Sequence, residues 1–245
     1  MNNRARLLAA ILLLTQILGG SLALGRSLGV LGGNSAADWA SLDSFNRIAM
    51  AAIGEMEILP GDRAAIEVDA SPRDLNRLHI HVADDTLHVD YREGWLAALG
   101  PRPQPIRYVV TVPELRGLDL AGAATISVAE VDTERFELEV RGIGAVDLAA
   151  MAVDALDVNF SGGGTVTMAG IAADQAVSIS GAGAYEAGEL RSETARIRVS
   201  GAGSAMVWVT EALDIDISGL GEVSYLGTPR VTQSVTGLGG VKQVE

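Results

Sequence analysis

One pattern occurs three times in succession: Val177-Ser-Ile-Ser-Gly-Ala-Gly183, Ile197-Arg-Val-Ser-Gly-Ala-Gly203 and Ile215-Asp-Ile-Ser-Gly-Leu-Gly221. In each copy, two apolar residues alternate with polar ones and are followed by Ser-Gly-x-Gly. Alternation with a period of two predicts a half-buried β-strand, and the glycines allow a sharp bend and the close approach of a neighbouring backbone. These segments therefore predict short strands that end at a tight corner.

The corner recurs throughout the second half of the chain at intervals of 18–20 residues, with first glycines at Gly122, Gly142, Gly162, Gly181, Gly201, Gly219 and Gly237. A unit this short cannot bury its apolar face alone, whereas stacked units can. Because parallel crossovers are right-handed, we expect an all-β protein whose repeats form a right-handed parallel β-helix (solenoid). Helical repeats would need 30–45 residues per unit and a period of 3.6, so we exclude them.

Stacking makes a specific prediction about columns of side chains. Residues at equal distance before each corner should lie above one another, so Val158, Val177, Ile197 and Ile215 should form an inward apolar ladder. The residues between them should point outward, and successive coils then read Glu137/Glu139, Asp157/Asn159, Ala176/Ser178, Arg196/Arg198 and Asp214/Asp216.

The preceding part, residues 43–113, is less regular but rich in β-strand patterns. The alternating runs Leu78–Val82 and Leu87–Tyr91 indicate a hairpin or two stacked strands. Residues 92–105, with three prolines, indicate a loop, and Ile106–Val112 a strand that Pro113 ends. We therefore divide the patterned chain into this N-terminal β-rich part and the coils of residues 114–245.

The first residues have the layout of a secretory signal peptide. Arg4 and Arg6 precede an apolar run, Leu7–Leu18, and small residues follow at Ser21 and Ala23. We expect residues 1–23 to be cleaved after Ala23 and residues 24–42 to form a linker; an uncleaved N-terminal membrane anchor is the alternative. The protein should thus be exported to the periplasm or to the cell surface or outer membrane.

Composition narrows the class of protein further. The chain has no cysteine, which excludes disulfides and thiolate metal sites. Its formal charge is −13, and loss of residues 1–23 would remove two arginines and no acid. So acidic a surface repels nucleic acid. Export without disulfides is typical of a bacterial envelope protein.

Several segments together resemble a known family, the auto-transporter adhesin head domain or GIN domain of bacterial envelope proteins. They are Phe45-x-Arg47-Ile48, Leu59–Asp62, Leu87–Tyr91, Thr111–Leu115, the Ser-Gly units at Ser180, Ser200 and Ser218, and Thr236–Gly239. The resemblance covers about residues 43–245. It implies a β-helical fold and an envelope or surface location, and it implies no catalytic residues.

The three histidines are the most distinctive polar residues. If Val82 faces Leu87 in the hairpin, His81 lies opposite His88 and His79 opposite Asp90, all on one face. Imidazoles with a carboxylate can bind zinc. The sequence favours an ordinary solvated strand face, so we assign no metal ligand, and whether His79, His81, His88 and Asp90 bind metal stays open.

No other pattern predicts a catalytic or cofactor site. The Gly-x-Gly corners lack the helix that a nucleotide-binding loop requires, so we expect no small-molecule cofactor. The outward acids could serve a polysaccharide hydrolase or lyase, but Arg196 and Arg198 should stack on Asp214 and Asp216 and explain them as charge pairs. We predict a non-enzymatic envelope domain for adhesion, binding or assembly, with a surface protein or glycan as partner. An enzyme acting on cell-surface polysaccharide and a structural or regulatory envelope component are the alternatives.

Overall fold

The computed structural model describes residues 35–38, 43–92 and 105–245. The predicted signal peptide, most of the predicted linker and nearly all of the predicted loop at 92–105 lie outside these ranges. Among the described residues, no helix is long and apolar enough to span a membrane.

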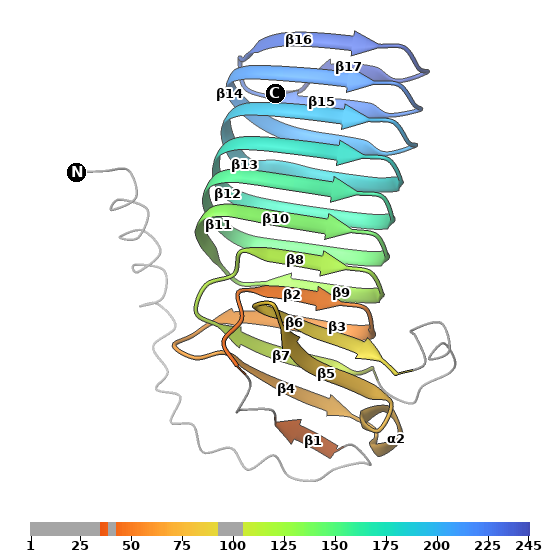
Figure 1. The fold of residues 1–245 in the computed structure, drawn as a ribbon. Helices are drawn as coiled ribbons and strands as arrows, with labels where there is room; N and C mark the ends of the chain where they lie inside the picture. Colours follow the sequence, from red (N-terminus) through yellow and green to blue (C-terminus); the bar gives the residue numbers. More distant parts are fainter. Residues whose placement is uncertain (1–34, 39–42, 93–104) are drawn as a thin grey trace, which may run out of the picture. The chain divides into compact units, whose positions relative to one another are not determined.

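The strands of the described residues form one continuous 17-stranded sheet that coils on itself, so that each coil contributes one strand segment to a front layer and one to a rear layer, called the front sheet and the rear sheet (Figure 1). The front sheet, which faces the viewer, contains β2 (Arg47–Met50), β8 (Gly117–Leu120), β10 (Val131–Val140), the second parts of β11 (Ile143–Phe160), β12 (Gly163–Ile179), β13 (Ala182–Val199) and β14 (Ser204–Ile217), and β16 (Arg230–Val235). The rear sheet contains β3 (Ile53–Pro60), β9 (Ala123–Val128), the first parts of β11–β14, β15 (Glu222–Leu226) and β17 (Gly240–Gln243).

The predicted fold class is confirmed. Front strands run from left to right in Figure 1 and the chain returns behind them as it climbs from β8 to β17, which makes the coil right-handed. The strands break at the Ser-Gly corners and continue through the opposite bend, where the pairing shifts register, for example between Leu148 and Met151. Gly170 and Gly188 lie at this second bend in single coils, but no motif repeats there from coil to coil, so the sequence did not locate it.

The corner glycines are required by the close approach of successive coils. A Cβ atom on Gly142 would lie 2.0 Å from the carbonyl oxygen of Gly122, and one on Gly162 would lie 1.9 Å from that of Gly142. The same contact continues upward, with 2.0 Å from Gly181 to Gly162 and 2.2 Å from Gly201 to Gly181. Only hydrogen fits at these positions, and this explains why glycine returns at each corner from Gly122 onward.

The predicted inward ladder is also confirmed. Val158 pairs with Val177, Val177 with Ile197, and Ile197 with Ile215, and all four side chains are buried. The next residue of the column, Gln233 in β16, is polar and exposed. The apolar column therefore ends on a side chain that water can solvate.

The solenoid begins earlier than the predicted boundary at residue 114. β2 and β3 pair in parallel with β8 and β9 and form a coil of their own. Their corner contains Ala51 and Ala52 instead of Ser-Gly, and residues 61–116 separate this coil from the next, so the repeat was not visible in the sequence. A strand, β1 (Ser35–Asp38), also lies within the predicted linker and pairs antiparallel with β4 (Ala65–Ala70).

The intervening residues extend both sheets below the first coil. They form β4 (Ala65–Ala70), α2 (Pro72–Leu75), β5 (Leu78–Ala83), β6 (Thr86–Tyr91) and β7 (Arg107–Val112). β6 pairs in parallel with β2 and antiparallel with β5, while β7 pairs in parallel with β3 and antiparallel with β4. The hairpin β5–β6 therefore continues the front sheet, and its outer side chains share a surface with the coils.

Candidate functional site

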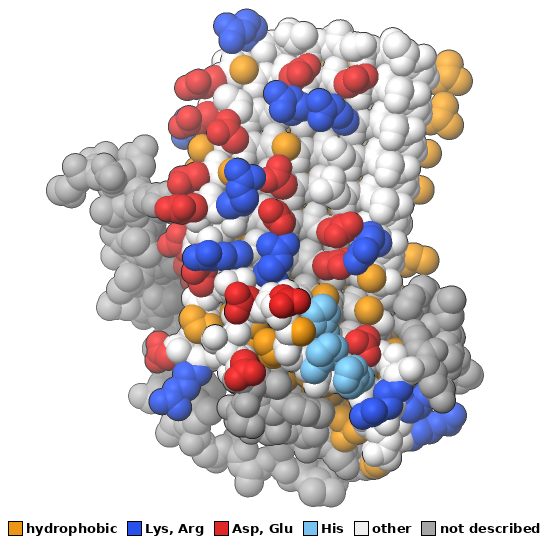
Figure 2. Space-filling view, viewed as in Figure 1, with side chains coloured by type: hydrophobic (Ala, Val, Ile, Leu, Met, Phe, Trp, Pro, Cys, Tyr) orange, Lys and Arg blue, Asp and Glu red, His pale blue; other side chains and the backbone are white. Residues whose placement is uncertain are grey.

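The outer surface of the front sheet, called the front face, carries the outward columns that the sequence predicted. Glu137, Asp157, Ala176, Arg196 and Asp214 pair in successive coils. The second column follows the same pairing and contains Glu139, Asn159, Ser178, Arg198 and Asp216. In Figure 2 acidic and basic side chains alternate in small groups over this face.

Most charged side chains of the front face form an ion pair with a neighbouring side chain of opposite charge. Arg196 Nε lies 3.7 Å from Asp214 Oδ2, and Arg135 Nη1 lies 2.5 Å from Asp157 Oδ2. The predicted stacking of Arg196 on Asp214 is thus confirmed. The sequence missed the contact between Arg47 Nη2 and Glu137 Oε2, at 2.7 Å, because Arg47 lies in the unrecognised first coil.

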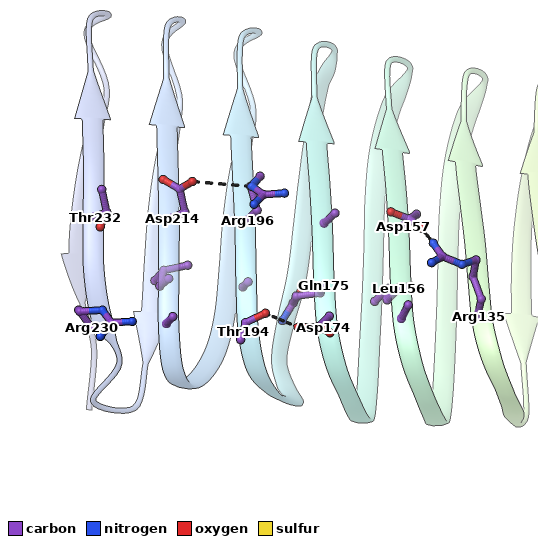
Figure 3. A pocket seen from close by; sticks show the side chains of 15 residues that line it. Arg135, Leu156, Asp157, Asp174, Gln175, Thr194, Arg196, Asp214, Arg230 and Thr232 are labelled. Atoms are coloured by element: carbon purple, nitrogen blue, oxygen red, sulfur yellow. Dashed lines mark hydrogen bonds and ion pairs between the residues drawn. The ribbon is translucent and has the colours of Figure 1, made fainter.

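A shallow hollow of about 520 Å³, called the upper hollow, lies between two of these ion pairs. Ala176 occupies the column position between Asp157 and Arg196, and the small residues Ala155 and Ala212 also line the hollow. Figure 3 shows the ion pairs Arg135–Asp157 and Arg196–Asp214 on either side, with the hydrogen-bonded pair Thr194–Asp174 below them. Small side chains between charged ones thus create a polar depression.

A second depression, called the lower hollow, begins where the hairpin joins the coils. Ala49 and Gly117 keep its floor low, and Thr86 and His88 line it from β6. Arg47 lies across Gly117, since a Cβ atom there would come within 2.8 Å of the guanidinium carbon of Arg47. His88 therefore lines this hollow next to the other two histidines of the hairpin.

The histidine cluster comprises His79, His81, His88 and Asp90 on the outer side of β5–β6. The predicted register is confirmed, with His79 opposite Asp90 and His81 opposite His88. The imidazoles of His79 and His81 stack at 4.3 Å between ring centroids, and those of His81 and His88 at 4.9 Å. His79 Nδ1 lies 3.3 Å from Asp90 Oδ1. Figure 2 shows the histidines as one continuous patch beneath the charged coils.

The electrostatic setting of His81 differs from that of a free histidine. Burial, and then the neighbouring His79 and His88, lower the pKa of His81 below its ordinary value of 6.5, while Asp90 opposes this shift. Its buried Nδ1 atom has no hydrogen-bond partner among the described residues. The ring is therefore neutral over a wider pH range and retains a nitrogen lone pair.

A further polar group, which the sequence analysis did not identify, lies inside the solenoid. Tyr185 from the rear sheet donates a hydrogen bond of 3.0 Å to Gln175 Oε1, and Gln175 Nε2 donates to Ser192 Oγ. Burial raises the pKa of Tyr185 above its ordinary value, which keeps the phenol protonated. All three residues are buried, so this group supports the core and cannot meet a ligand.

Comparisons with known proteins agree with this architecture. A putative adhesin from Bacteroides fragilis superimposes with a TM-score of 0.79 at 21% identity, over 87% of this chain and 98% of that chain. A putative lipid binding protein from Parabacteroides distasonis gives a TM-score of 0.67 at 18% identity, over 87% and 98%. A putative adhesin from Parabacteroides merdae gives 0.65 at 19% identity, over 87% and 97%. At these identities the likeness shows the fold alone.

A search among curated proteins found no match. At the level of sequence, residues 44–229 match the family described as "Putative auto-transporter adhesin, head GIN domain". Since the match covers more than half of the chain and the fold agrees with it, this protein belongs to the putative auto-transporter adhesin head GIN domain family.

Proposed function

We propose that this protein is an exported, non-enzymatic module of the bacterial envelope that binds a surface protein or glycan through its front face. The observation that carries the proposal is the upper hollow, in which small residues leave a polar depression between two arginine–carboxylate pairs. Guanidinium and carboxylate groups at such a rim can hydrogen-bond to sugar hydroxyls or to polar side chains of a protein.

The scaffold suits a binding role because it holds these groups in a repeated geometry. Successive strands lie about 4.8 Å apart, and every rung of the front sheet is hydrogen-bonded to the next. A surface of this kind loses little conformational entropy when a partner binds, which favours affinity. Membership of an adhesin family supports the same conclusion.

A second surface feature also favours binding. The residue between the two corner glycines is apolar and exposed in several coils, most clearly Ile143, Leu220 and Leu238, with exposed fractions of 63%, 62% and 88%. Because the corners stack, these positions form a row along one edge of the coils, in which Leu220 and Leu238 are neighbours and the smaller residues Gly163, Ala182 and Ala202 separate them from Ile143. Exposed rows of this kind add contact area for a partner.

Enzymatic action on polysaccharide has less support. A glycosidase needs one carboxyl group that protonates the leaving oxygen and a second that acts as base or nucleophile. In the front face Asp157, Asp214 and Glu137 each form an ion pair with an arginine, so these carboxylates already have a partner within the protein. These acids are therefore better suited to recognition than to proton transfer.

The proposal can be tested with one pair of variants. Ala176→Tyr would fill the upper hollow, whereas Thr167→Tyr would add the same side chain at an exposed position of the rear sheet. Binding of the mature protein to isolated envelope fragments of its own bacterium should fall at least tenfold for Ala176→Tyr and remain unchanged for Thr167→Tyr. Equal binding by both variants, or release of reducing sugar ends from the fragments by the wild-type protein, would contradict the proposal.

A further inference from the structure

We propose that His79, His81 and Asp90 form a surface zinc site on the hairpin β5–β6, with His88 or water as the fourth ligand. The ligand atoms of His79, His81 and Asp90 all lie within 4.8 Å of one another. This site is separate from the upper hollow, so the proposal does not depend on the proposed function.

The hairpin places the ligands by simple geometry. His79 and His81 are two residues apart on β5 and therefore point to the same side, while the register brings Asp90 and His88 opposite them on β6. Both strands are tied into the front sheet, because β6 also pairs with β2. The four side chains thus extend from a hydrogen-bonded backbone and need only side-chain rotations to reach a common ion.

One of the distances already fits a tetrahedral ion. Zinc binds imidazole nitrogen and carboxylate oxygen at about 2.0–2.2 Å, so two ligands of a tetrahedral site lie about 3.3–3.6 Å apart. His79 Nδ1 and Asp90 Oδ1 are already 3.3 Å apart. Rotation of the stacked His81 ring toward them would close the remaining gap.

The donor set selects the class of metal. Two or three imidazoles and one carboxylate suit zinc, whereas magnesium and calcium require oxygen ligands. The chain contains three histidines in all and no cysteine, so every imidazole that the protein possesses is concentrated on this one face. Coordination would also give a partner to the His81 ring, whose buried Nδ1 atom makes no hydrogen bond within the described residues.

The test uses the mature full chain, purified without a histidine tag and titrated with zinc chloride. Native mass spectrometry should show one zinc per chain, and calorimetry should show a loss of affinity of about tenfold or more in His79→Gln, His81→Gln and Asp90→Asn. Asp214→Asn removes an exposed carboxylate elsewhere on the front face and should bind zinc as the wild type does.

The melting temperature provides a second measurement of zinc binding, independent of calorimetry. Zinc should raise the melting temperature of the wild type and of Asp214→Asn but not that of His81→Gln, and circular dichroism should show the same β-sheet content in all of them. Absence of stoichiometric zinc from the wild type, or undiminished binding in His81→Gln and Asp90→Asn, would overturn the proposal. Tight binding of copper or nickel with no binding of zinc would overturn the assignment of the metal.

Discussion

Arg47 and Glu137 are 90 positions apart in the sequence, yet their side chains meet at 2.7 Å on the front face. Gly117 lies between them in the stack, since it pairs with Arg47 on one side and with Glu137 on the other. The absence of a side chain at Gly117 lets the guanidinium group lie across that strand. The contact joins the first coil to the repetitive coils, so the ion pairs of the front face extend over both parts.

Gly117 lies in the front sheet and Gly142 at a corner, and replacing each by alanine should lower the free energy of unfolding by different amounts. In Gly117→Ala the new Cβ meets the flexible end of Arg47, which can move away, whereas in Gly142→Ala it meets the backbone oxygen of Gly122. Because the Arg47–Glu137 pair is exposed, the first change should cost less than about 1 kcal/mol of unfolding free energy. The second should cost about 2 kcal/mol or more through overpacking. Denaturant melts measure both, and equal costs would disprove the close-approach explanation of the corners.

The orientation of side chains in β13 leads to a second prediction. Ile197 is buried in the inward ladder, and the adjacent Arg196 points outward. Ile197→Asp buries a charge without a partner and should cost several kcal/mol; Arg196→Ser loses one exposed ion pair and should cost less than about 1 kcal/mol. Denaturant melts of the two variants compare these costs, and similar losses would mean that inside and outside are wrongly assigned.

The buried hydrogen bonds of Tyr185 and Gln175 should be coupled. Gln175→Leu suits its column, which has Leu156 below and Leu213 two rungs above, but it leaves the Tyr185 hydroxyl without its 3.0 Å acceptor. We expect a loss of about 1–3 kcal/mol in either Gln175→Leu or Tyr185→Phe. The double variant should cost less than the sum of the two, which a double-mutant cycle detects. Strict additivity would show that the bond contributes nothing.

Glu114 should make stability depend on pH in the acid range. Hydrogen bonds from Arg116 and Thr133 lower the pKa of Glu114 below its ordinary value of 4.5. A carboxyl group with a lowered pKa in the folded state stabilises the protein above its unfolded pKa and loses this contribution as pH falls through the folded value. The stability difference between the wild type and Glu114→Gln should therefore be constant from pH 7 to about 5 and shrink below about 4.5. Denaturant melts over this range measure it, and a difference that grows toward acid pH would contradict the assignment.

Export gives a prediction for the N-terminus. Mature protein from the native host should begin near Leu24, and Ala23→Arg should prevent processing because a small residue is needed before the cleavage site. Cell fractionation followed by N-terminal sequencing tests both statements. Unprocessed, soluble cytoplasmic protein would contradict them, and unprocessed membrane-bound protein would favour the anchor.

The sequence by itself determined the stacking register of the repetitive coils and the face to which each side chain of the hairpin points. A period of two within each unit and 18–20 residues between units leave one way to bury Val158, Val177, Ile197 and Ile215 together, and a slip of one residue would turn them to solvent. In the hairpin, alternation alone placed the histidines and Asp90 on one face; the pairing of His79 with Asp90 and of His81 with His88 followed only if Val82 faces Leu87, as the structure shows.

Only the tertiary structure decided which surfaces these elements share. Local patterns report the face that each strand buries and contain no information about partners far along the chain, so the first coil at β2–β3 and its return to β8 and β9 after residues 61–116 were not foreseen. The Arg47–Glu137 contact and the continuity of the histidine cluster with the front face depend on that return. The Tyr185–Gln175–Ser192 group was missed for a related reason. A polar residue at an inward position looks like an outward one until a partner from the opposite sheet satisfies it.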